Sequence, residues 1–316
     1  MSSVLGKVLD NVMIRLHKCV LQSCDMQFGF KKGHSTTQCT AIVEEVINYY
    51  ENRGSSVYVL MLDASQAFDR VNYKNLFCTL LNRGMCYLTT RLLFNIYTNQ
   101  LLSIAWGDCT STKFKPSNGV KQGGVLSPLL FTLYIDSLFS ELKHYGFECY
   151  IGDLFSGAFG YADDIVLLAP TIYALNKLYD ICNKYGNSHN IKFNPQKSKL
   201  LAFNSDIGCV IDNNFLPCQP IDKHVGHVIG PGLVDEDIKS KINEMVINTN
   251  HLVSTFKNAS YDIKYKLFKT FAMPLYGCVS ILKRYLYVGE SASEDLLMFL
   301  TIPTLFCCLL YVEIYQ

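Results

Sequence analysis

The chain lacks a dominant charge, sequence repeats and low-complexity linkers. Among its 316 residues, 28 lysines and arginines stand against 27 aspartates and glutamates, so the formal net charge is +1. This balance excludes a uniformly basic surface, and any nucleic-acid partner must be held by local patches. With 49% apolar residues the chain can fill a sizeable core. Disordered, collagen-like and coiled-coil chains are therefore excluded.

Signs of secretion are also missing. The 13 cysteines include no Cys-x-x-Cys pair, only Cys307 and Cys308 are adjacent, and the count is odd. These features argue against a zinc knuckle or a disulfide framework and favour a reducing compartment. The first thirty residues carry Asp10, Arg15 and Lys18 among apolar positions, which predicts an amphipathic helix and not a signal peptide.

A long apolar run is missing until the end of the chain. Residues 296–312 pass without a charge, but Pro303 and two threonines interrupt them, and their length is at the short limit for a membrane span. Three interpretations stay open. The run is a membrane anchor, a buried core segment, or sequence foreign to the fold. An anchor would leave the preceding chain cytoplasmic, because Lys283 and Arg284 come before the run.

Apolar periodicity predicts a mixture of helices and short strands. A capping box at Ser35 and Gln38 predicts a helix that ends near Gly54, and Ser127-Pro128 predicts another helix start. Further helices are expected over 3–16, 74–97 and 171–186. Strands are expected over 57–62, 191–193 and 199–203, a strand-turn-strand over 158–169, and a hairpin over 101–115.

From about residue 237 the pattern changes to helices with a basic surplus. Apolar residues over 238–256 share one helix face, and a second helix is predicted over 262–272. Residues 238–284 hold eight lysines and arginines but two acids. The surplus is either a solvated face or a nucleic-acid contact, and the pattern alone does not decide between them.

Three carboxylates stand at the ends of predicted strands. Asp63 follows the run VYVLML, and Asp163 and Asp164 lie in the turn at 161–164 (YADD). Carboxylates held close together repel one another, and their oxygens are suited to Mg²⁺. Two such ions about 3.5–4 Å apart can support phosphoryl transfer. The alternative is a pair of solvated acids in a hairpin turn, which the doublet by itself favours.

Six sequence blocks follow one another in a characteristic order. They are residues 27–38 (QFGFKKGHSTTQ), 59–71 (VLMLDASQAFDRV), 118–131 (NGVKQGGVLSPLLF), 161–164 (YADD), 194–200 (NPQKSKL) and 223–229 (KHVGHVI). Together the blocks resemble the reverse transcriptases of non-LTR (LINE-type) retrotransposons. Intron-encoded maturases share the palm motifs, but the first and last blocks favour the LINE-type branch.

The resemblance implies an α+β fold of the right-hand polymerase type, in which an antiparallel palm sheet carries the aspartates, helices pack behind it and a helical thumb follows. It divides the chain into fingers and palm over 1–230, with incomplete fingers, a thumb-like segment over 231–284, and an apolar tail of uncertain origin over 285–316. The thumb helices would contact duplex phosphates and not base edges.

The resemblance also implies roles at the centre of the site. Asp63 and Asp163, with Asp164 assisting, would bind two Mg²⁺ ions, or Mn²⁺ in their place. Lys197 would donate a proton to the leaving pyrophosphate, although a lysine there is ordinarily a surface residue. Phe68 would exclude a ribose 2′-hydroxyl by steric clash, where a core phenylalanine is the plain alternative.

Other implied roles concern the nucleotide and the primer. Gln122, Gly123 and Gly124 would line the nucleotide pocket, and Lys31 or Lys32 would contact the triphosphate. The primer end would be held by a primer grip formed by His224, Val225, Gly226, His227 and Val228. This grip departs from the family, which usually has an aromatic residue and a leucine where this chain has His224 and Val225.

The implied reaction is the addition of deoxynucleoside triphosphates to a DNA primer along an RNA or DNA template, in the nucleus or the cytoplasm. The expected fingers strand upstream of residue 3, an endonuclease and an RNase H are all missing, so we expect an N-terminally truncated element. The rival hypothesis is an inactive relic that at most binds nucleic acid. A membrane-tethered protein is a third hypothesis that rests on residues 296–312 alone.

Overall fold

Two compact units, Met1–Pro231 and Gly232–Gln316, make up the chain. The computed structural model describes residues 4–272 except 122, 147, 206–207, 212–213, 220–221 and 231–233. The predicted tail at 285–316, with its apolar run, lies outside the described residues. In the part that is described, every helix is too short or too polar to span a membrane.

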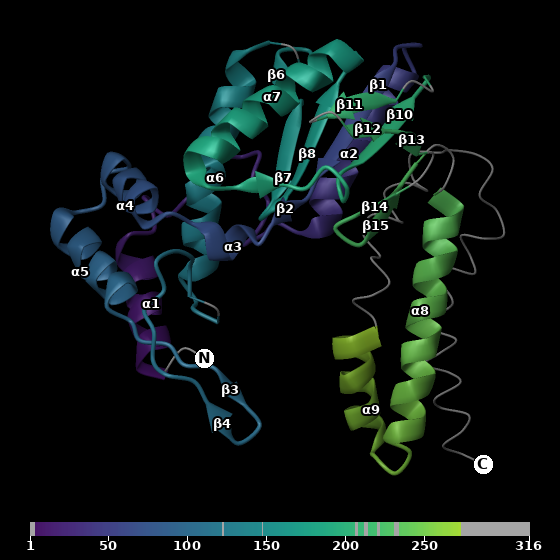
Figure 1. Cartoon of the computed structure of the whole chain (residues 1–316). Helices are drawn as coiled ribbons and strands as arrows, with labels where there is room; N and C mark the ends of the chain where they lie inside the picture. The colour runs from purple at the N-terminus through teal and green to yellow at the C-terminus, as the bar shows by residue number, and fades with distance from the viewer. Residues whose placement is uncertain are drawn as a thin grey trace. The chain divides into compact units, whose positions relative to one another are not determined.

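A five-stranded sheet forms the centre of the first unit, in the order β13-β10-β1-β8-β7 (Figure 1). Its strands are β1 (Val57–Leu62), β7 (Ala158–Tyr161), β8 (Asp164–Ala169), β10 (Lys199–Phe203) and β13 (Cys218–Gln219). β1 lies antiparallel between β8 and β10, and β7 is antiparallel to β8. The expected antiparallel sheet is therefore confirmed, with β13 added parallel to β10 at one edge.

Helices cover both faces of this sheet. α6 (Ser127–His144) and α7 (Ile172–His189) lie on one face and α2 (Thr36–Glu51) lies on the other (Figure 1). The side chains of β1 alternate between the two cores: Tyr58, Leu60 and Leu62 pack with α6 and α7, and Val57, Val59 and Met61 pack with α2. Burial on both faces explains why β1 reads as a continuous apolar run. The sequence predicted helices behind the sheet, and the structure has a layer on each side.

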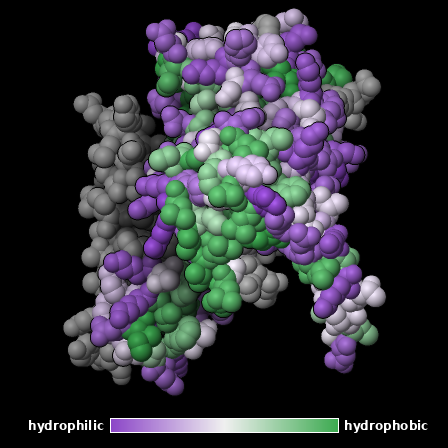
Figure 2. Space-filling model, turned by 90° about the vertical axis from the view of Figure 1, so that its left-hand side faces the viewer, coloured by the Kyte–Doolittle hydropathy of each residue, from purple (hydrophilic) through white to green (hydrophobic). Residues whose placement is uncertain are grey.

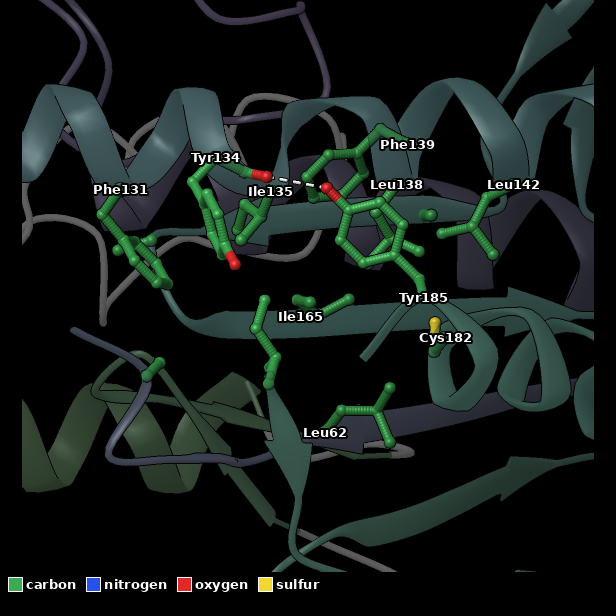
Figure 3. Close-up of a cluster of buried hydrophobic side chains, with 14 of the residues drawn as sticks. Leu62, Phe131, Tyr134, Ile135, Leu138, Phe139, Leu142, Ile165, Cys182 and Tyr185 are labelled. Carbon is green, nitrogen blue, oxygen red and sulfur yellow. Dashed lines mark hydrogen bonds between the residues drawn. The ribbon is translucent and has the colours of Figure 1, made fainter. Parts of the chain in front are cut away.

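The larger core forms where α6 meets the sheet and α7 (Figure 3). The side chains of Phe131, Leu138 and Leu142 on α6 are almost fully buried. Tyr185 of α7 is buried with them and donates its hydroxyl to the Tyr134 carbonyl at 2.7 Å. A buried tyrosine needs such a partner, because an unpaired hydroxyl in a core is destabilising.

The region between β1 and α6 is built from short elements. They are β2 (Ala64–Ser65), α3 (Ala67–Arg70), α4 (Tyr73–Asn82), α5 (Tyr87–Thr98), β3 (Ala105–Trp106) and β4 (Cys109–Thr110). The helix predicted over 74–97 is two helices, because Gly84 adopts φ +88° and ends the first. The predicted hairpin over 101–115 is confirmed by the pairing of β3 with β4.

α1 (Val4–Leu16) confirms the helix predicted at the start of the chain. Its apolar residues do not all face the core: Val4, Leu5 and Leu16 are exposed, as is Leu88 on α5. Apolar side chains gather over this side of the first unit in Figure 2. α1 nevertheless contributes Met13 to the larger core.

The remaining short strands form hairpins and one two-stranded pair. They are β5 (Tyr150–Ile151) with β6 (Leu154–Phe155), β9 (Lys192–Phe193) with β2, β11 (Cys209–Ile211) with β12 (Asn214–Leu216), and β14 (Asp222–His224) with β15 (His227–Ile229).

The described residues of the second unit, 234–272, are mostly helical, as the sequence predicted. α8 (Val234–Thr255) is followed by α9 (Tyr261–Leu267), which continues as a π-helical turn over Phe268–Ala272. Met245 of α8 and Phe268 of the turn are buried. Lys257, Lys266 and Lys269 are exposed, so part of the basic surplus faces solvent.

Candidate active site

The strand register brings the lone aspartate and the acidic doublet to the same end of the sheet. Leu62 of β1 pairs with Ile165 of β8, the last pair before both strands reach their acidic residues. Asp63 and Asp164 are the next residues on these neighbouring antiparallel strands. Residues opposite each other in such a pair have Cα atoms about 4.5–5.5 Å apart. Two acidic segments 100 residues apart in the sequence therefore meet.

Asp163 belongs to the tight turn between β7 and β8. Tyr161 pairs with Asp164, which leaves Ala162 and Asp163 as the turn residues. Ala162 is buried and adopts φ +59°. An alanine in this left-handed region is strained by about 1–2 kcal/mol, so the turn must be held by its surroundings.

The electrostatics of the doublet follow from this arrangement. Partial desolvation, together with the charges of Asp163 and Asp63, raises the pKa of Asp164 to about 6. Desolvation, with a smaller contribution from the charge of Asp63, also raises the pKa of Asp163. The charge of Asp63 is thus close enough to disfavour the ionisation of Asp163 and Asp164. Protons or a cation would relieve this repulsion.

The aspartate side chains are close enough for their charges to interact but are not arranged as a metal site. Within the described ranges, no three histidine, cysteine, aspartate or glutamate side chains are grouped closely enough to hold a metal ion. The donor chemistry nevertheless fits a hard divalent cation, because carboxylate oxygens are the ligands that Mg²⁺ prefers. The fit rests on the donor type and the mutual repulsion of the carboxylates.

The segment that carries Lys197 is attached to the backbone of Asp63. The Asn194 amide donates to the Asp63 carbonyl at 2.9 Å, and β9 pairs with β2 directly after Asp63. Lys197 lies in the following turn, where its side chain is exposed. The structure therefore attaches a solvated lysine to the same end of the sheet as the aspartates.

Phe68 stands on α3, just beyond Asp63, and is partly buried. Its ring stacks on Phe131 of α6 with the centroids 4.2 Å apart, and Phe30 meets it edge-on at 6.4 Å. The Phe68 carbonyl accepts a hydrogen bond from the Val120 amide at 2.9 Å. This bond attaches the sequence block at 118–131 to the segment that follows Asp63.

The predicted nucleotide-pocket residues lie in the same block. Gln122 is outside the described residues. Gly123 adopts φ +75°, a conformation that favours glycine. Gly124 is buried, and a Cβ there would come within 2.6 Å of the Ser127 hydroxyl oxygen. The second glycine thus packs closely against the start of α6, where a Cβ would displace the Ser127 hydroxyl.

Sequence reasoning missed the residue that caps α6. Asp10 of α1 accepts hydrogen bonds from the amides of Val125 at 2.9 Å and Leu126 at 3.3 Å. A carboxylate at a helix N-terminus satisfies amides that lack partners in the helix and complements the helix dipole. Asp10 appeared in the sequence as an ordinary polar residue of an amphipathic helix, and nothing in its spacing signalled the contact.

Of the two predicted fingers lysines, one is engaged and the other is solvated. Lys31 donates to the Cys24 carbonyl at 2.7 Å and lies 3.6 Å from the Asp25 carboxylate. The side chain of Lys32 is exposed.

The predicted primer-grip residues form the β14–β15 hairpin. Val225 and Gly226 make its two-residue turn, both with positive φ. Lys199 of β10 bonds to Asp222 of β14 at 2.5 Å, and Ile229 of β15 is buried in the core beneath α2. The hairpin is thereby attached to the main sheet. The side-chain placements of the predicted residues His224, His227 and Val228 lie outside the described features.

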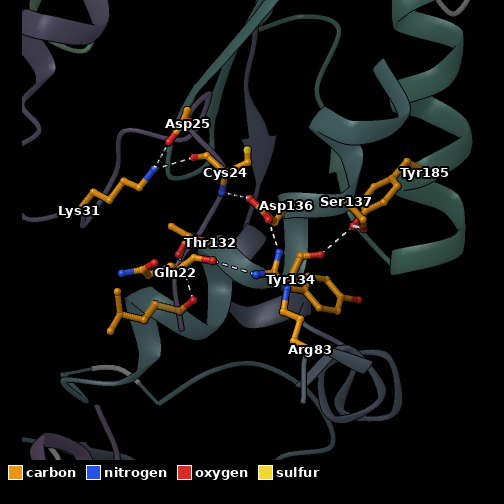
Figure 4. Close-up of polar contacts among 11 residues, drawn as sticks. Gln22, Cys24, Asp25, Lys31, Arg83, Thr132, Tyr134, Asp136, Ser137 and Tyr185 are labelled. Carbon is orange, nitrogen blue, oxygen red and sulfur yellow. Dashed lines mark hydrogen bonds and ion pairs between the residues drawn. The ribbon is translucent and has the colours of Figure 1, made fainter. Parts of the chain in front are cut away.

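A buried ion pair was also missed. Asp136 lies in the middle of α6, is 5% exposed, and contacts the Arg83 guanidinium (Figure 4). Its other oxygen accepts from the Cys24 amide at 2.7 Å. Arg83 also donates to the Gln22 carbonyl at 2.8 Å. The single charge inside the run LLFTLYIDSLF was a signal that could have identified Asp136.

Comparison with known proteins adds sequence relatives to this geometry. The family model described as "Reverse transcriptase (RNA-dependent DNA polymerase)" matches residues 1–264. The Pol polyprotein of the R2DM retrotransposable element of Drosophila melanogaster is 29% identical over 195 residues, 62% of this chain and 18% of the relative. The RNA-directed DNA polymerase of the mobile element jockey from Drosophila funebris is 24% identical over 298 residues, 85% of this chain and 31% of the relative.

A solved structure agrees at the level of the fold. Telomerase from Candida tropicalis, in complex with a fragment of telomeric RNA, superposes with a TM-score of 0.51 at 12% identity. The match covers 88% of this chain and 47% of the telomerase chain. The expected right-hand polymerase fold is confirmed. The chain spans less than a third of the length of the curated relatives described above.

Proposed function

Because the chain belongs to the reverse transcriptase (RNA-dependent DNA polymerase) family, we propose that it adds deoxynucleotides to a primer 3′-hydroxyl along an RNA template. The observation that carries the proposal is the register of β1 and β8, which brings Asp63 to the same end of the sheet as Asp163 and Asp164. The relatives of the chain among retrotransposable elements support a role in copying such an element.

Members of this family use divalent metal ions, and we propose that Asp63 and Asp163, with Asp164 assisting, hold two Mg²⁺ ions. The raised pKa values of Asp163 and Asp164 support this, because carboxylates that repel one another gain most from a cation between them. When bound, Mg²⁺ supplies neutralisation of the triphosphate charge and a lowered pKa for the primer hydroxyl. Mn²⁺ has the same preference for oxygen ligands and is expected to substitute.

The proposed role of Lys197 is to give a proton to the leaving pyrophosphate. The exposed side chain and the hydrogen bond between Asn194 and Asp63 support it, because the lysine is solvated yet attached to the segment of the first aspartate. A lysine ammonium can act as a general acid when it is within reach of the leaving oxygen.

For the incoming nucleotide, we propose that Phe68 fills the space that a ribose 2′-hydroxyl would need. The stack on Phe131 supports a rigid ring at this position, and a rigid ring discriminates by clash. Gln122, Gly123 and Gly124 are proposed to line the same pocket. Phe68→Ala should raise ribonucleotide incorporation relative to deoxynucleotide incorporation. An unchanged ratio in primer extension would remove the gate role.

The triphosphate is proposed to be contacted by a fingers lysine. Lys32 is better suited to this than Lys31, because the Lys31 ammonium already binds the Cys24 carbonyl and the Asp25 carboxylate. The primer end is proposed to rest on the hairpin of His224, Val225, Gly226, His227 and Val228. The ion pair between Lys199 and Asp222 supports a hairpin that is fixed to the sheet.

Residues 1–230 are proposed to act as fingers and palm, and residues 231–284 as the thumb. The boundary between the two compact units after Pro231 supports this division. The exposed Lys257, Lys266 and Lys269 are suited to duplex phosphates, which would make binding strongly dependent on salt.

Primer extension on an RNA template tests the proposal. Wild-type protein should extend a DNA primer with deoxynucleotides only when Mg²⁺ is present. Asp163→Asn should reduce the rate by at least about 10³-fold, since metal coordination stabilises the transition state by several kcal/mol. Asp153→Asn, in the exposed turn between β5 and β6, is the matched control and should match wild type.

The outcomes separate the proposal from its rival. A folded wild-type protein that does not extend primers in Mg²⁺ would support the inactive relic. Extension by Asp163→Asn at the wild-type rate would overturn the metal assignment. Extension that survives removal of Mg²⁺ and Mn²⁺ by a chelator would do the same.

A further inference from the structure

The turn that carries the acidic doublet depends on a partner outside its own hairpin. Ala162 is 5% exposed and has φ +59°. Left-handed backbone at an alanine is unfavourable by about 1–2 kcal/mol, and it persists only where the surrounding structure determines it. Both backbone polar groups of Ala162 also need partners, since burial excludes water.

One side chain satisfies both groups. Gln27 is fully buried, and its Oε1 accepts from the Ala162 amide at 2.9 Å. Its Nε2 donates to the Ala162 carbonyl at 3.3 Å. The same Oε1 accepts from the Gly29 amide at 2.9 Å. Among side chains that do not titrate, only a carboxamide carries its donor and its acceptor on separate atoms, and asparagine is one methylene shorter.

The backbone around Gln27 is built for this close approach. Phe28 donates to the Gly160 carbonyl at 2.7 Å, and Gly160 donates to the Met26 carbonyl at 2.9 Å. A Cβ on Gly29 would come within 2.4 Å of the Ala162 nitrogen. A Cβ on Gly160 would come within 3.1 Å of the Gln27 Nε2 and within 2.5 Å of the ring of Phe139. The two glycines therefore allow the segment to lie against the turn.

The segment is also fixed upstream of Gln27. Asp136 of α6 holds the Cys24 amide, and Lys31 donates to the Cys24 carbonyl, so that both backbone groups of Cys24 are bound (Figure 4). Asp136 is held in turn by Arg83. A chain of contacts thus leads from α6 through Cys24 to Gln27 and the acidic turn.

We propose that Gln27 is a positioning residue for the acidic doublet: its carboxamide holds Ala162 in the left-handed conformation and thereby fixes how Asp163 and Asp164 are presented at the end of the sheet. The inference deepens the proposed function and rests on it for the catalytic consequence. The hydrogen bonds themselves stand independently of any activity.

The first test uses the metal-free protein and amide hydrogen exchange by NMR. Gln27→Leu removes both bonds to Ala162 at similar volume, and exchange of the Ala162 amide should accelerate by about 10- to 100-fold, as expected for a lost bond to a buried group. Gln27→Glu keeps an acceptor for this amide but loses the donor to the Ala162 carbonyl. Its Ala162 amide should stay largely protected.

Leu178→Ala is the matched control, because Leu178 is fully buried in the same unit and makes no hydrogen bond to the turn. This substitution lowers global stability without a local effect on the turn. Hydrogen exchange of its Ala162 amide should therefore accelerate no more than exchange of the β1 amides. Equal acceleration in Leu178→Ala and Gln27→Leu, or continued protection in Gln27→Leu, would overturn the proposal. If Gln27→Leu does not fold, Gln27→Met, which also removes both bonds to Ala162 at similar volume, replaces it, and continued protection of the Ala162 amide in that variant would overturn the proposal.

The second test concerns metal binding and catalysis. Residues that orient metal ligands typically change affinity by about 10- to 100-fold when replaced. Gln27→Leu should weaken Mn²⁺ binding in electron paramagnetic resonance titrations by this factor and raise the Mg²⁺ requirement for extension, with the KM for deoxynucleotides at saturating Mg²⁺ unchanged. A merely structural role predicts the reverse: unchanged Mn²⁺ affinity per folded molecule. If wild type binds no Mn²⁺ and extends no primer, the proposed function fails. The exchange test still decides whether Gln27 holds Ala162 in place.

Discussion

The two acidic segments of the site are held in place by different physical means. Asp63 follows the central strand β1, whose six residues are buried between two helical layers. The doublet follows the edge strand β7, in a turn whose strained Ala162 is held by the Gln27 carboxamide. Apolar burial determines the first position, and a few hydrogen bonds determine the second. Asp63 should therefore lose its position only when the whole unit unfolds, whereas the doublet should lose its position by local opening of the turn.

The largest expected effect is on the Asp63 side. Leu60 is fully buried in the centre of β1, and Leu60→Ala should lower the free energy of unfolding of the first unit by about 2–5 kcal/mol. The loss combines the transfer of the removed methyl groups with the cavity that they leave. Urea denaturation followed by circular dichroism measures it.

Leu154→Ala is the control, because this side chain is 68% exposed in the β5–β6 hairpin and its loss should change stability by at most about 0.5 kcal/mol. The comparison fails if the two substitutions destabilise equally. It also fails if Leu60→Ala selectively frees Asp63 while the rest of the sheet keeps its protection from hydrogen exchange.

The second effect is on the side of the doublet. Asp136→Asn leaves the Arg83 guanidinium without its counter-charge while keeping an acceptor for the Cys24 amide. Arg83 is partly exposed, so we expect a loss of about 1–3 kcal/mol, below the value for a fully buried pair. Hydrogen exchange should accelerate first around Cys24 and Gln27, and urea denaturation should report the total.

An exposed ion pair on α7 provides the contrast. Lys177 and Asp180 are 3.9 Å apart at the surface, and Asp180→Asn should change stability by less than about 0.5 kcal/mol. Should both variants behave alike, burial would not distinguish the two pairs, and the supporting role of Asp136 would have to be abandoned.

The elements that apolar pattern and capping determine were predictable from the sequence. The run VYVLML, the capping box of Ser35 and Gln38, and the helix start at Ser127-Pro128 all appear as expected, since each depends on neighbours in the sequence. The prediction of one helix over 74–97 was wrong in one respect, because Gly84 ends α4 before α5 begins.

The polar contacts of the site were not predictable in the same way. Asp10 caps a helix that begins 117 residues later in the chain, and Gln27 bonds to a turn 135 residues away. Such pairs carry no periodic signal, and only the order of the sequence blocks pointed to the region. The meeting of Asp63 with Asp163 and Asp164 was predicted from the resemblance and from their positions at strand ends, and the register agrees with it.

The third effect is a pH dependence on the doublet side. The folded state raises the pKa of Asp164 from 3.8 to about 6, so the folded protein binds this proton more tightly than the unfolded chain does. In metal-free buffer the associated stability is complete below about pH 4 and is lost as the pH rises through 6. Asp164→Asn removes the repulsion and should be more stable than wild type at pH 7.5. This gap, the difference in free energy of unfolding between the variant and wild type, should close toward pH 4.5.

The gap should stay below about 1 kcal/mol, because the Asp164 side chain is exposed and its interactions are screened. Thermal unfolding at the two pH values measures this difference, and Mg²⁺ should reverse its sign at pH 7.5 by stabilising the wild type more than Asp164→Asn. Asp153→Asn, in an exposed turn, should show no gap at either pH. A gap that widens toward acidic pH would contradict the direction of the shift.

The smallest effect separates strain from hydrogen bonding within the turn itself. Ala162→Gly keeps both backbone bonds to Gln27 but removes the steric cost of a left-handed alanine, about 1–2 kcal/mol. Glycine also makes the unfolded chain more flexible, which opposes folding by about 0.5–1 kcal/mol. The net change should be a stabilisation of about 0–1 kcal/mol in urea denaturation. In the Gln27→Leu background the same substitution should stabilise by less, because without the two bonds from Gln27 the alanine can leave the left-handed conformation and its strain is already relieved. Equal effects in the two backgrounds would mean that the carboxamide and the left-handed backbone are independent, and that the doublet is held, like Asp63, by its strands alone.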